Sequence, residues 1–447
     1  MDKNIFIDLI FKKAEEKNIK EFEIYFLSGK STSLKIFNGK IENFSDNQNQ
    51  GISFRGKFFG KMGYSYTESF TEEDADFLIR EAEENASVIE SDDEQIIYDG
   101  RGEYVEIDNY SPSIENIEVS QIEDFLVKME KEAKSFDKRV KNVTTCMFGM
   151  GNSERVIKNS KGVDLRDRGN VAYTYISITA EENGVIKTGS DFKIGRKFED
   201  FDYKEISHNA VEKATSKFDT VSKEIKESKC VIENMAFTSL IGSMAGIFSA
   251  EAVQKGVSLL KGKIGEKIAS EKFTLVDDPH LENGDASSSF DSEGVPTKYK
   301  ELISNGVLKT YLYNLKTAKK DGVESTGNAS KGGYKGTIGI SSYNLYVKKG
   351  EKDFETLLKD VCDGVLITEF AGLHSGLNSI SGDFSLAGEG FLIENGKKGK
   401  ALNQITIAGN YFELLKNIEE VGNDLKFSLS STGSPSVVVK KLHFSVD

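Results

Sequence analysis

The chain has 447 residues, of which 38% are hydrophobic and 29% charged. This composition is typical of a globular protein too long for one hydrophobic core. The formal net charge is −14 without a long Lys/Arg block, so a face that neutralises nucleic acid phosphates or an anionic membrane surface is not expected. No run approaches the ~18 apolar residues of a membrane span, and the first residues lack a signal-peptide pattern. We therefore expect a cytoplasmic protein.

The cysteines point to the same compartment. Cys146, Cys230 and Cys362 are odd in number, far apart in the sequence, and form no CxxC pair. We expect three buried thiols in a reducing environment rather than a disulfide framework.

The first part of the chain reads as a helix, several strands and a second helix. The predicted elements are a helix over 2–17, strands over 21–27, 31–37, 40–44, 51–54 and 58–66, and a helix over 72–88. Asn38-Gly39 lies between two β-prone runs and is the strongest hairpin signal. Thr71 with Asp74 predicts the cap of the second helix.

A similar order follows about 120 residues later. The predicted elements are a helix over 120–136, strands over 140–148, 154–158, 171–180 and 185–192, and a helix over 203–218. Ser120 with Glu123 is interpreted as a capping box, and a turn is predicted over 159–162. We infer an α+β N-terminal domain over 1–225 built by duplication, with repeats over about 1–90 and 119–220. The acidic segment 91–118, which contains Pro112, is predicted to link them.

The second domain is predicted over 226–447 and is mainly β. It opens with a small-residue-rich helix, or two joined helices, over 234–260, whose glycines favour close packing against a neighbour. The glycine-rich run from 325 to 336 predicts a loop. Strands are predicted over 273–276, 302–313, 390–394, 404–408 and 437–439. The predicted fold class is thus α+β, with a duplicated helix and β-hairpin domain before a mainly β domain.

The stretch from Gly364 to Gly390 concentrates unusual residues. Its glycines at 372, 376, 382, 388 and 390 permit positive φ and close backbone approach, and they surround His374 and Asp383. Two interpretations stay open, a wall of a cleft or a glycine-rich corner whose polar groups are satisfied locally.

Metal and acyl-transfer chemistry find little support in the residues. A helical zinc site needs two histidines one turn apart, but no two of the four histidines are close, and His208 with Glu212 is interpreted as a solvated helix face. The carboxylates of Asp277, Asp278, Asp291 and Glu293 could hold a hard cation, although turn chemistry explains them as well. His374, Ser375 and Asp383 have triad residue types without a nucleophile elbow.

Five ordered strings resemble the TldD/PmbA family, once called modulators of DNA gyrase, over nearly the whole chain. They read DDPHL, FDSEGVPTKYKELISNGVLKTYL, STGNA, GLHSGLNSISGDFSLAGEGFLIENG and VGNDL. The resemblance implies a cytosolic metallopeptidase assembled from two related subunits. The TldD type carries HExxxH, but residues 241–246 read IGSMAG, and residues 429–435 lack the expected cysteine. This chain therefore resembles the PmbA (TldE) type.

The resemblance implies a subunit that binds no metal and no cofactor and shapes a peptide cleft, while a TldD-like partner carries zinc. A heterodimer is expected, with a homodimer as an option in isolation. Alternatives are a regulator that binds a protein such as gyrase, and an independent hydrolase that uses His374. No catalytic residue is assigned. The expected cleft or interface residues are His374, Ser375, Gly376, Asn378, Ser381, Gly382, Asp383, Thr326, Gly327 and Asn328.

Overall fold

The computed structural model describes residues 1–90 and 93–446. Ser91 and Asp92, which begin the predicted linker, and Asp447, which ends the second predicted domain, lie outside the described residues. The chain divides into two compact units. Unit 1 comprises Met1–Thr215, Ser289–Thr297 and Tyr313–Ile340, and unit 2 comprises Ser216–Ser288, Lys298–Leu312 and the chain from Ser341 on. The boundary near residue 225 stays a prediction, because compactness does not establish independent folding.

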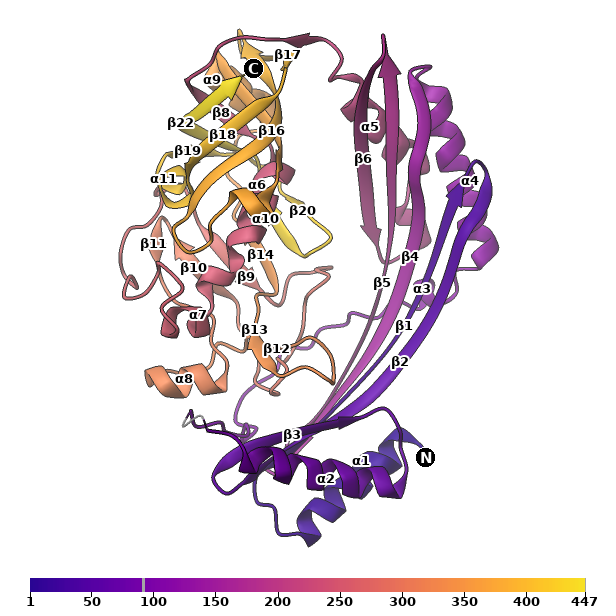
Figure 1. The fold of residues 1–447 in the computed structure, drawn as a ribbon, viewed down its shortest axis with the longest axis vertical. Helices are drawn as coiled ribbons and strands as arrows, with labels where there is room; N and C mark the ends of the chain where they lie inside the picture. Colours follow the sequence, from indigo (N-terminus) through magenta and orange to yellow (C-terminus); the bar gives the residue numbers. More distant parts are fainter. Residues whose placement is uncertain (91–92, 447) are drawn as a thin grey trace. The chain divides into compact units, whose positions relative to one another are not determined.

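Unit 1 is built on a long, curled antiparallel sheet in the order β3-β2-β1-β4-β5-β6 (Figure 1). The strands are β1 Phe22–Phe37, β2 Lys40–Phe58, β3 Lys61–Thr67, β4 Val140–Asn159, β5 Asp164–Glu182 and β6 Val185–Gly195. Pairing of β1 with β4 joins two three-stranded halves at the centre. The mixed α+β class predicted for this part of the chain is confirmed.

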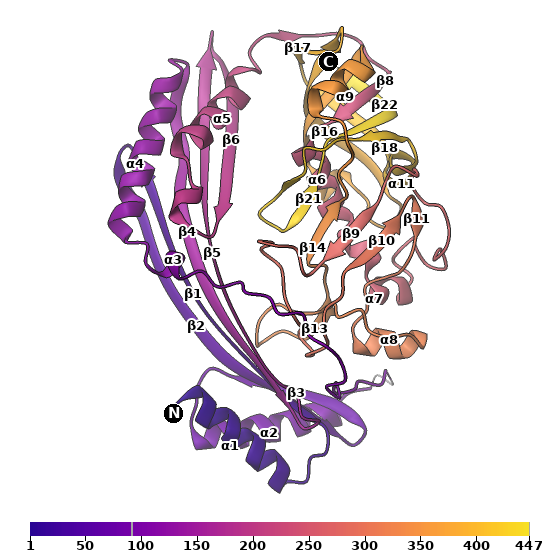
Figure 2. The ribbon, with the colours of Figure 1, turned by 180° about the vertical axis from the view of Figure 1, so that it is seen from behind.

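Each half of the sheet is preceded and followed by a helix, as the sequence predicts. The helices are α1 Lys3–Glu16, α2 Glu72–Ser87, α4 Val119–Phe136 and α5 Tyr203–Thr215, and the connection between the halves holds the short α3 Pro112–Glu115. Helices α1 and α2 lie side by side, as do α4 and α5, seen from both sides in Figures 1 and 2. Helix α4 buries Ile122, Leu126 and Met129 at helical spacing. Origin by duplication remains our interpretation of this repeated order.

Of the two predicted capping boxes, one is confirmed and one is wrong. The Thr71 hydroxyl accepts from the Asp74 amide at 3.2 Å and the Asp74 carboxylate accepts from the Thr71 amide at 2.9 Å, which confirms the first capping box. The box predicted from Ser120 is wrong. Helix α4 begins one residue earlier, and its cap is Glu118, whose amide donates to Gln121 Oε1 at 2.9 Å.

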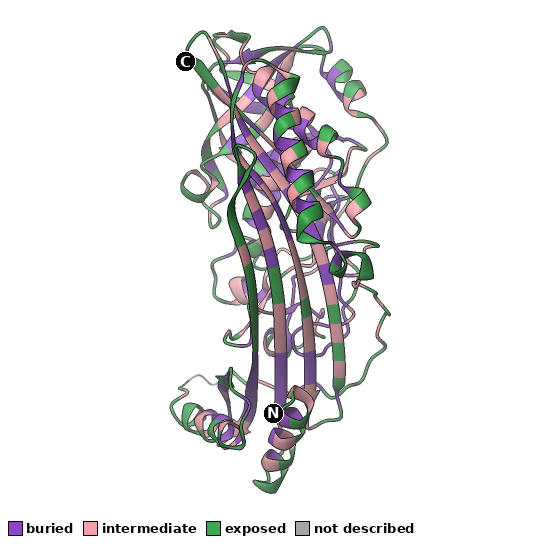
Figure 3. Cartoon of the chain, turned by 90° about the vertical axis from the view of Figure 1, so that its right-hand side faces the viewer, coloured by how far each residue is buried: buried purple, intermediate pink, exposed green. Residues whose placement is uncertain are grey.

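Most strands of the large sheet are longer than predicted. The exception is β3, predicted over 58–66 and observed over Lys61–Thr67, because Phe59-Gly60 turns the chain with φ of 51° and 79°. Breaks expected within 28–30 and 45–50 are absent, because Gly29 pairs with Asn49 on one side and Ser153 on the other, and ladder hydrogen bonds override weak β propensity. Figure 3 shows buried and exposed residues mixed along these strands. The Asn38-Gly39 hairpin is confirmed, with φ of 52° and 70°, as a two-residue turn with both residues left-handed requires.

Unit 2 contains two further sheets. Strand β15 pairs with both β8 and β16, so the path β15-β8-β22-β18-β16 closes on itself, while the second sheet has the order β11-β10-β9-β14-β21-β20. The strands of these sheets include β8 Glu227–Ile232, β9 Leu275–Asp278, β14 Asn344–Val347, β15 Gly364–Ala371, β16 Asp383–Glu394, β18 Ile405–Asn410, β20 Lys426–Phe427, β21 Thr432–Ser434 and β22 Val437–Val446. The others are β7 Thr220–Val221, β10 Lys300–Ser304, β11 Val307–Leu308, β17 Lys397–Leu402 and β19 Ile418–Val421.

Two predictions for the second half are right in kind but not in their bounds. Of the two alternatives for 234–260, the structure shows two joined helices, α6 Asn234–Met244 and α7 Ala250–Gln254, with a 3-10 turn over Ala245–Phe248 between them, where Gly246 is a weak helix former. The helical region ends at Gln254 and not at residue 260. Strands are present in the region predicted over 302–313, as β10 and β11. Asn305-Gly306, with φ of 47° and 81°, forms the turn between them, and β11 ends at Leu308.

The segments 289–297 and 313–340 belong to unit 1 although they lie in the second half of the sequence. They carry α8 Leu315–Asp321 and the hairpin of β12 Ala329–Lys331 with β13 Ile338–Ile340. Their apolar side chains share a core with the sheet. That cluster contains Tyr25, Tyr98, Ile157, Val163, Phe290, Val295, Leu315 and Tyr334.

The cysteine prediction is correct for two residues. Cys146 and Cys230 are buried, whereas Cys362 is exposed at the end of α9 Phe354–Val361, and all three are free thiols. Across the part of the chain that the structure describes, no helix is long and apolar enough to cross a membrane.

Candidate functional site

The Gly364–Gly390 stretch forms β15, the short helix α10 Leu373–Gly376, a turn and the start of β16. Gly372 and Gly382 have φ of 81° and 80°. A Cβ on Gly376 would lie 2.4 Å from the Ser385 carbonyl oxygen, and one on Gly390 would lie 2.4 Å from that of Leu366. The predicted tight turning and close backbone approach are therefore confirmed.

A polar turn connects α10 to β16. Asn378 Oδ1 accepts from the amides of Ile380 at 2.9 Å and Ser381 at 3.1 Å. Asn410, from the end of β18, donates to Asp383 Oδ1 at 2.9 Å, and this hydrogen bond, with that of Ser381, lowers the pKa of the Asp383 carboxyl. The turn is thus held by its own side chains, while Asn378 and Asp383 remain exposed.

His374 and Ser375 are exposed on α10. The Ser375 hydroxyl donates to the Gly372 carbonyl at 3.3 Å. Within residues 1–90 and 93–446, His374 has no hydrogen bond to Ser375 or Asp383. The geometry needed for a His-activated nucleophile is not formed here.

The segments where the TldD type carries metal ligands meet in unit 2. A Cβ on Gly242 of α6 would lie 3.6 Å from Thr432 Oγ1 of β21, so residues 241–246 and 429–435 are neighbours. Zinc in proteins is held by His, Cys, Asp or Glu. The side chains here are Ile241 and Met244, both buried, and Ser243, which donates to the Ser239 carbonyl. This donor set does not fit zinc.

The VGNDL string fixes the start of α6. Asp424 Oδ2 accepts from Ser436 Oγ at 2.7 Å and from Asn234 Nδ2 at 3.2 Å, and its Oδ1 accepts from the Ser436 amide at 2.9 Å. Helix α10 also contacts α6 (Figure 1). One carboxylate therefore positions the helix that carries the IGSMAG segment.

The four carboxylates considered for a cation fall in different units. Asp277, in β9, accepts from Lys300 Nζ at 2.9 Å and from the Tyr343 amide at 2.6 Å, and Asp278 accepts from the His280 amide at 2.9 Å. Asp291 and Glu293 lie in unit 1. Among the described residues, no group of three or more His, Cys, Asp or Glu side chains is arranged to hold a metal ion.

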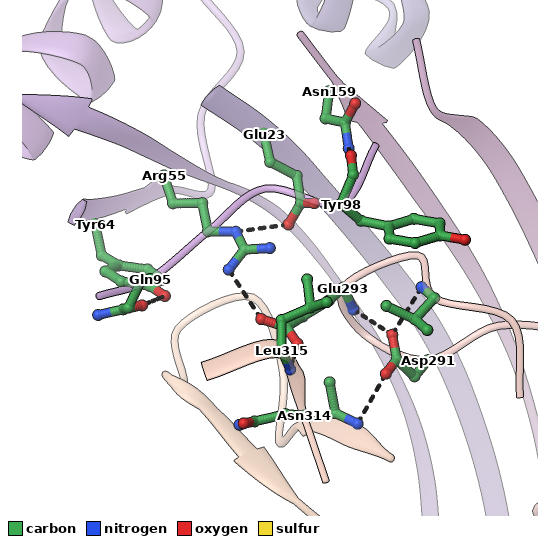
Figure 4. A network of polar contacts seen from close by, with 12 residues as sticks. Glu23, Arg55, Tyr64, Gln95, Tyr98, Asn159, Asp291, Glu293, Asn314 and Leu315 are labelled. Carbon is green, nitrogen blue, oxygen red and sulfur yellow. Dashed lines mark hydrogen bonds and ion pairs between the residues drawn. The ribbon is translucent and has the colours of Figure 1, made fainter. Parts of the chain in front are cut away.

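Asp291 and Glu293 instead organise a buried polar network in unit 1 (Figure 4). Asp291 accepts from the amides of Glu293, Val295 and Ala329 at 2.8–3.0 Å. It is fully buried, and burial followed by the charge of Glu293 raises the pKa of its carboxyl to about 8. The FDSEG string therefore closes its own turn and binds β12.

Glu293 links that turn to the sheet. Its Oε1 accepts from Arg55 Nη1 at 3.2 Å, and its Oε2 accepts from the Leu315 amide, at the start of α8, at 2.8 Å. Arg55 Nε also donates to Glu23 Oε1 at 2.8 Å, and all three charged residues are at most 4% exposed. Burial raises the pKa of Glu23, although the charge of Arg55 opposes this.

Sequence reasoning missed Glu23 and Arg55. A signal was present, since each is a single charged residue inside an apolar β run, FEIYF and ISFRG. A charge at such a position requires a buried partner.

The STGNA residues lie inside unit 1. The Thr326 hydroxyl accepts from the Tyr313 amide at 2.7 Å. Gly327 has φ of 70°, and a Cβ there would lie 2.5 Å from the Pro296 carbonyl oxygen. Gly327 and Asn328 are buried and Thr326 is half-buried, so this segment packs against FDSEGVPT within the unit.

The sequence matches three family models along its length. They are described as PmbA/TldA metallopeptidase domain 1, central domain and C-terminal domain, and they cover residues 22–86, 112–218 and 225–446.

Among curated relatives, Metalloprotease PmbA of Escherichia coli O157:H7 is 30% identical over 67% of this chain and 64% of its own length. A metalloprotease of Methanocaldococcus jannaschii is 26% identical over 96% of this chain and 94% of its own length.

Solved structures extend the likeness to the whole fold. A Thermotoga maritima protein described as a candidate modulator of a DNA gyrase is 34% identical, covers 99% of this chain and all of its own, and has a TM-score of 0.93. TldE from Thermococcus kodakarensis is 26% identical, covers 98% and 100%, and has a TM-score of 0.90. The resemblance read from the sequence is confirmed, and the chain belongs to the PmbA/TldD metallopeptidase family.

Proposed function

We propose that this chain is the TldE-type subunit of a two-subunit peptidase, in which a TldD-like partner holds the zinc and this chain helps to shape the peptide site. The observation that carries the proposal is the contact between α6 and β21. The segments that would supply metal ligands in a TldD-type chain are neighbours here, yet they carry isoleucine, methionine, glycine, serine and threonine.

The polar turn between α10 and β16 is the part of unit 2 that we propose to face the peptide or the partner. His374, Ser375 and Asn378 are exposed there, and the turn is fixed by the Asn378 and Asp383 hydrogen bonds. A rigid turn that leaves polar side chains exposed can bind an extended peptide at a low entropic cost. Ser381, Gly376 and Gly382 serve this role by shaping the backbone, and Thr326, Gly327 and Asn328 are proposed only as support within unit 1.

Reconstitution tests the proposal. The purified chain, a TldD-like subunit, and their mixture are assayed on an unfolded protein substrate, and complex formation is measured in parallel by light scattering. We expect a stable mixed complex that cleaves and an inactive chain alone. Cleavage by this chain alone, at a level unchanged after gel filtration and chelation, would contradict the proposal.

A second candidate function rests on the Thermotoga maritima relative, whose description names a DNA gyrase. A regulator of that kind would bind gyrase directly without a TldD-like partner. Binding of the purified chain to gyrase, measured by calorimetry in the absence of other proteins, would favour this candidate.

A further inference from the structure

Lys331 is the last residue of β12, and its ammonium group points into unit 1. Its Nζ donates to the Ser53 hydroxyl on β2 and lies 4.6 Å from the centre of the Tyr25 ring on β1. Within the described part of the chain, no carboxylate oxygen lies within ion-pair distance of this nitrogen. Lys331 is half-buried, and its ammonium is thus held by a hydroxyl and a ring face without a carboxylate, which compensate its lost hydration poorly.

The charged groups around Lys331 come from two strands and one loop. Arg55 on β2 repels its charge and Glu23 on β1 attracts it, while Glu293 forms an ion pair with Arg55. Burial, followed by the charge of Arg55, lowers the pKa of Lys331 to about 7. Tyr25 stays neutral in this range, because burial raises the pKa of its phenol.

Lys331 sits in the hairpin that carries the glycine-rich segment. Strand β12 pairs with β13 in its sheet. Its first residue is tied to the FDSEG turn, because the Ala329 carbonyl accepts from the Ser292 amide at 3.0 Å and the Ala329 amide donates to Asp291 at 2.9 Å. Side chains attach the rest of the hairpin to the large sheet. Tyr334, between the two strands, lies against Gly51, where a Cβ would be 2.4 Å from its ring, and its hydroxyl donates to Glu68 at 2.5 Å. Lys331 is therefore one of several contacts that hold residues 329–340 in place.

We propose that Lys331 is a proton-sensitive latch, which holds the hairpin of β12 and β13 on the sheet when its amine is neutral and loosens the hairpin when the amine is protonated. The latch lies within unit 1 and stands apart from the proposed function.

The direction of the pH effect follows from linkage. In the undocked hairpin Lys331 is hydrated, with the ordinary pKa of about 10.5, so between pH 7 and 10.5 the undocked state binds more protons than the docked state. The docked state of the hairpin is therefore increasingly favoured as pH rises from 7 to 10.5. Below pH 7 the free energy of docking no longer changes with pH, because Lys331 is protonated in both states.

Hydrogen–deuterium exchange of the full chain tests the latch. After correction for the intrinsic pH dependence of exchange, we expect the protection of β12 and β13 amides to rise by up to about tenfold per pH unit between pH 7.5 and 9.5, as one linked proton requires. Amides of β15 and β16 serve as an internal reference.

Two variants isolate the amine. Lys331→Met should abolish the pH-dependent rise, because a neutral side chain of similar length replaces the amine. Lys335→Met, which removes an exposed lysine paired with Glu68 in the same segment, should retain it. A rise that is absent from the wild type, or equal in the wild type and Lys331→Met, would overturn the proposal.

A measurement on the wild type alone covers the case in which Lys331→Met fails to fold. Lysine labelled with carbon-13 at the ε position reports each amine by NMR during a pH titration. We expect one lysine to titrate near pH 7, and a spectrum in which every lysine titrates above pH 9 would overturn the latch.

Discussion

Two strings that mark the family behave in opposite ways. In FDSEG, Asp291 and Glu293 are buried and use their carboxylates on four backbone amides and one guanidinium. In GLHSGLNSISGD, the glycines are engaged in close packing while His374, Ser375 and Asn378 are exposed. The difference teaches that acidic residues in a motif can serve the fold alone, whereas polar residues of a glycine-rich turn can help to hold the turn and still remain exposed to a ligand.

The largest expected effect comes from Arg55→Met. It would leave Glu23 and Glu293 buried without their common partner, and the loss of one member of a buried ion pair costs about 3–5 kcal/mol. Urea unfolding should show that loss. Arg101→Met is the matched control, since Arg101 is exposed and pairs with Asp99 at the surface. Equal free energies of unfolding for Arg55→Met and Arg101→Met would show that the buried network of Glu23, Arg55 and Glu293 does not stabilise the fold.

A smaller loss is expected from Gly376→Ala. The new Cβ would meet the Ser385 carbonyl oxygen at 2.4 Å, and overpacking against backbone costs about 1–3 kcal/mol. Gly246→Ala is the control, because nothing lies within 4 Å of the Cβ position there. Equal melting temperatures of Gly376→Ala and Gly246→Ala would mean that α10 can move away from β16 to accommodate the methyl group.

Asp291→Asn tests the pH dependence of the buried turn. The native pKa of about 8 exceeds the ordinary value of 3.8, so this carboxyl contributes stability that is complete below pH 4 and lost as pH rises through 8. The unfolding free energy of the wild type should therefore fall, relative to that of the variant, by about 4 kcal/mol from pH 4.5 to 8. A difference that is constant with pH would show that Asp291 is ionised in the folded protein.

The smallest effect on stability is expected from His374→Ala. The imidazole is exposed and has no hydrogen-bond partner within the described residues, so the melting temperature should not change. Peptidase activity of the mixture with a TldD-like subunit should fall, because the side chain faces peptide or partner in our proposal. Full activity of the mixture that contains His374→Ala would show that the His374 side chain is not needed for binding the peptide or the partner.

The order of elements in unit 1 could be predicted because its signals are local. Asn38-Gly39 and the Thr71–Asp74 box act over a few residues, and the structure retains both. The lengths of the strands could not be predicted in this way, since polar runs such as 45–50 remain extended only because a neighbouring strand pairs with them.

The buried network was beyond sequence reasoning for a related reason. Glu293 lies 238 residues from Arg55, and no local pattern joins positions at that separation. The candidate turn was easier to find, because the glycines that shape it are adjacent in sequence to the residues it presents. The exposure of Cys362 was not foreseen, since it depends on where α9 ends.

The most direct test of the central claim is elemental analysis for zinc, performed on this chain alone, on a TldD-like subunit and on their purified complex. The IGSMAG segment and residues 429–435 offer no zinc ligand. We predict no zinc in this chain, one zinc per TldD-like subunit, and one zinc per heterodimer. One zinc in the isolated chain, retained after dialysis against a chelator, would contradict the claim that this subunit leaves the metal to its partner.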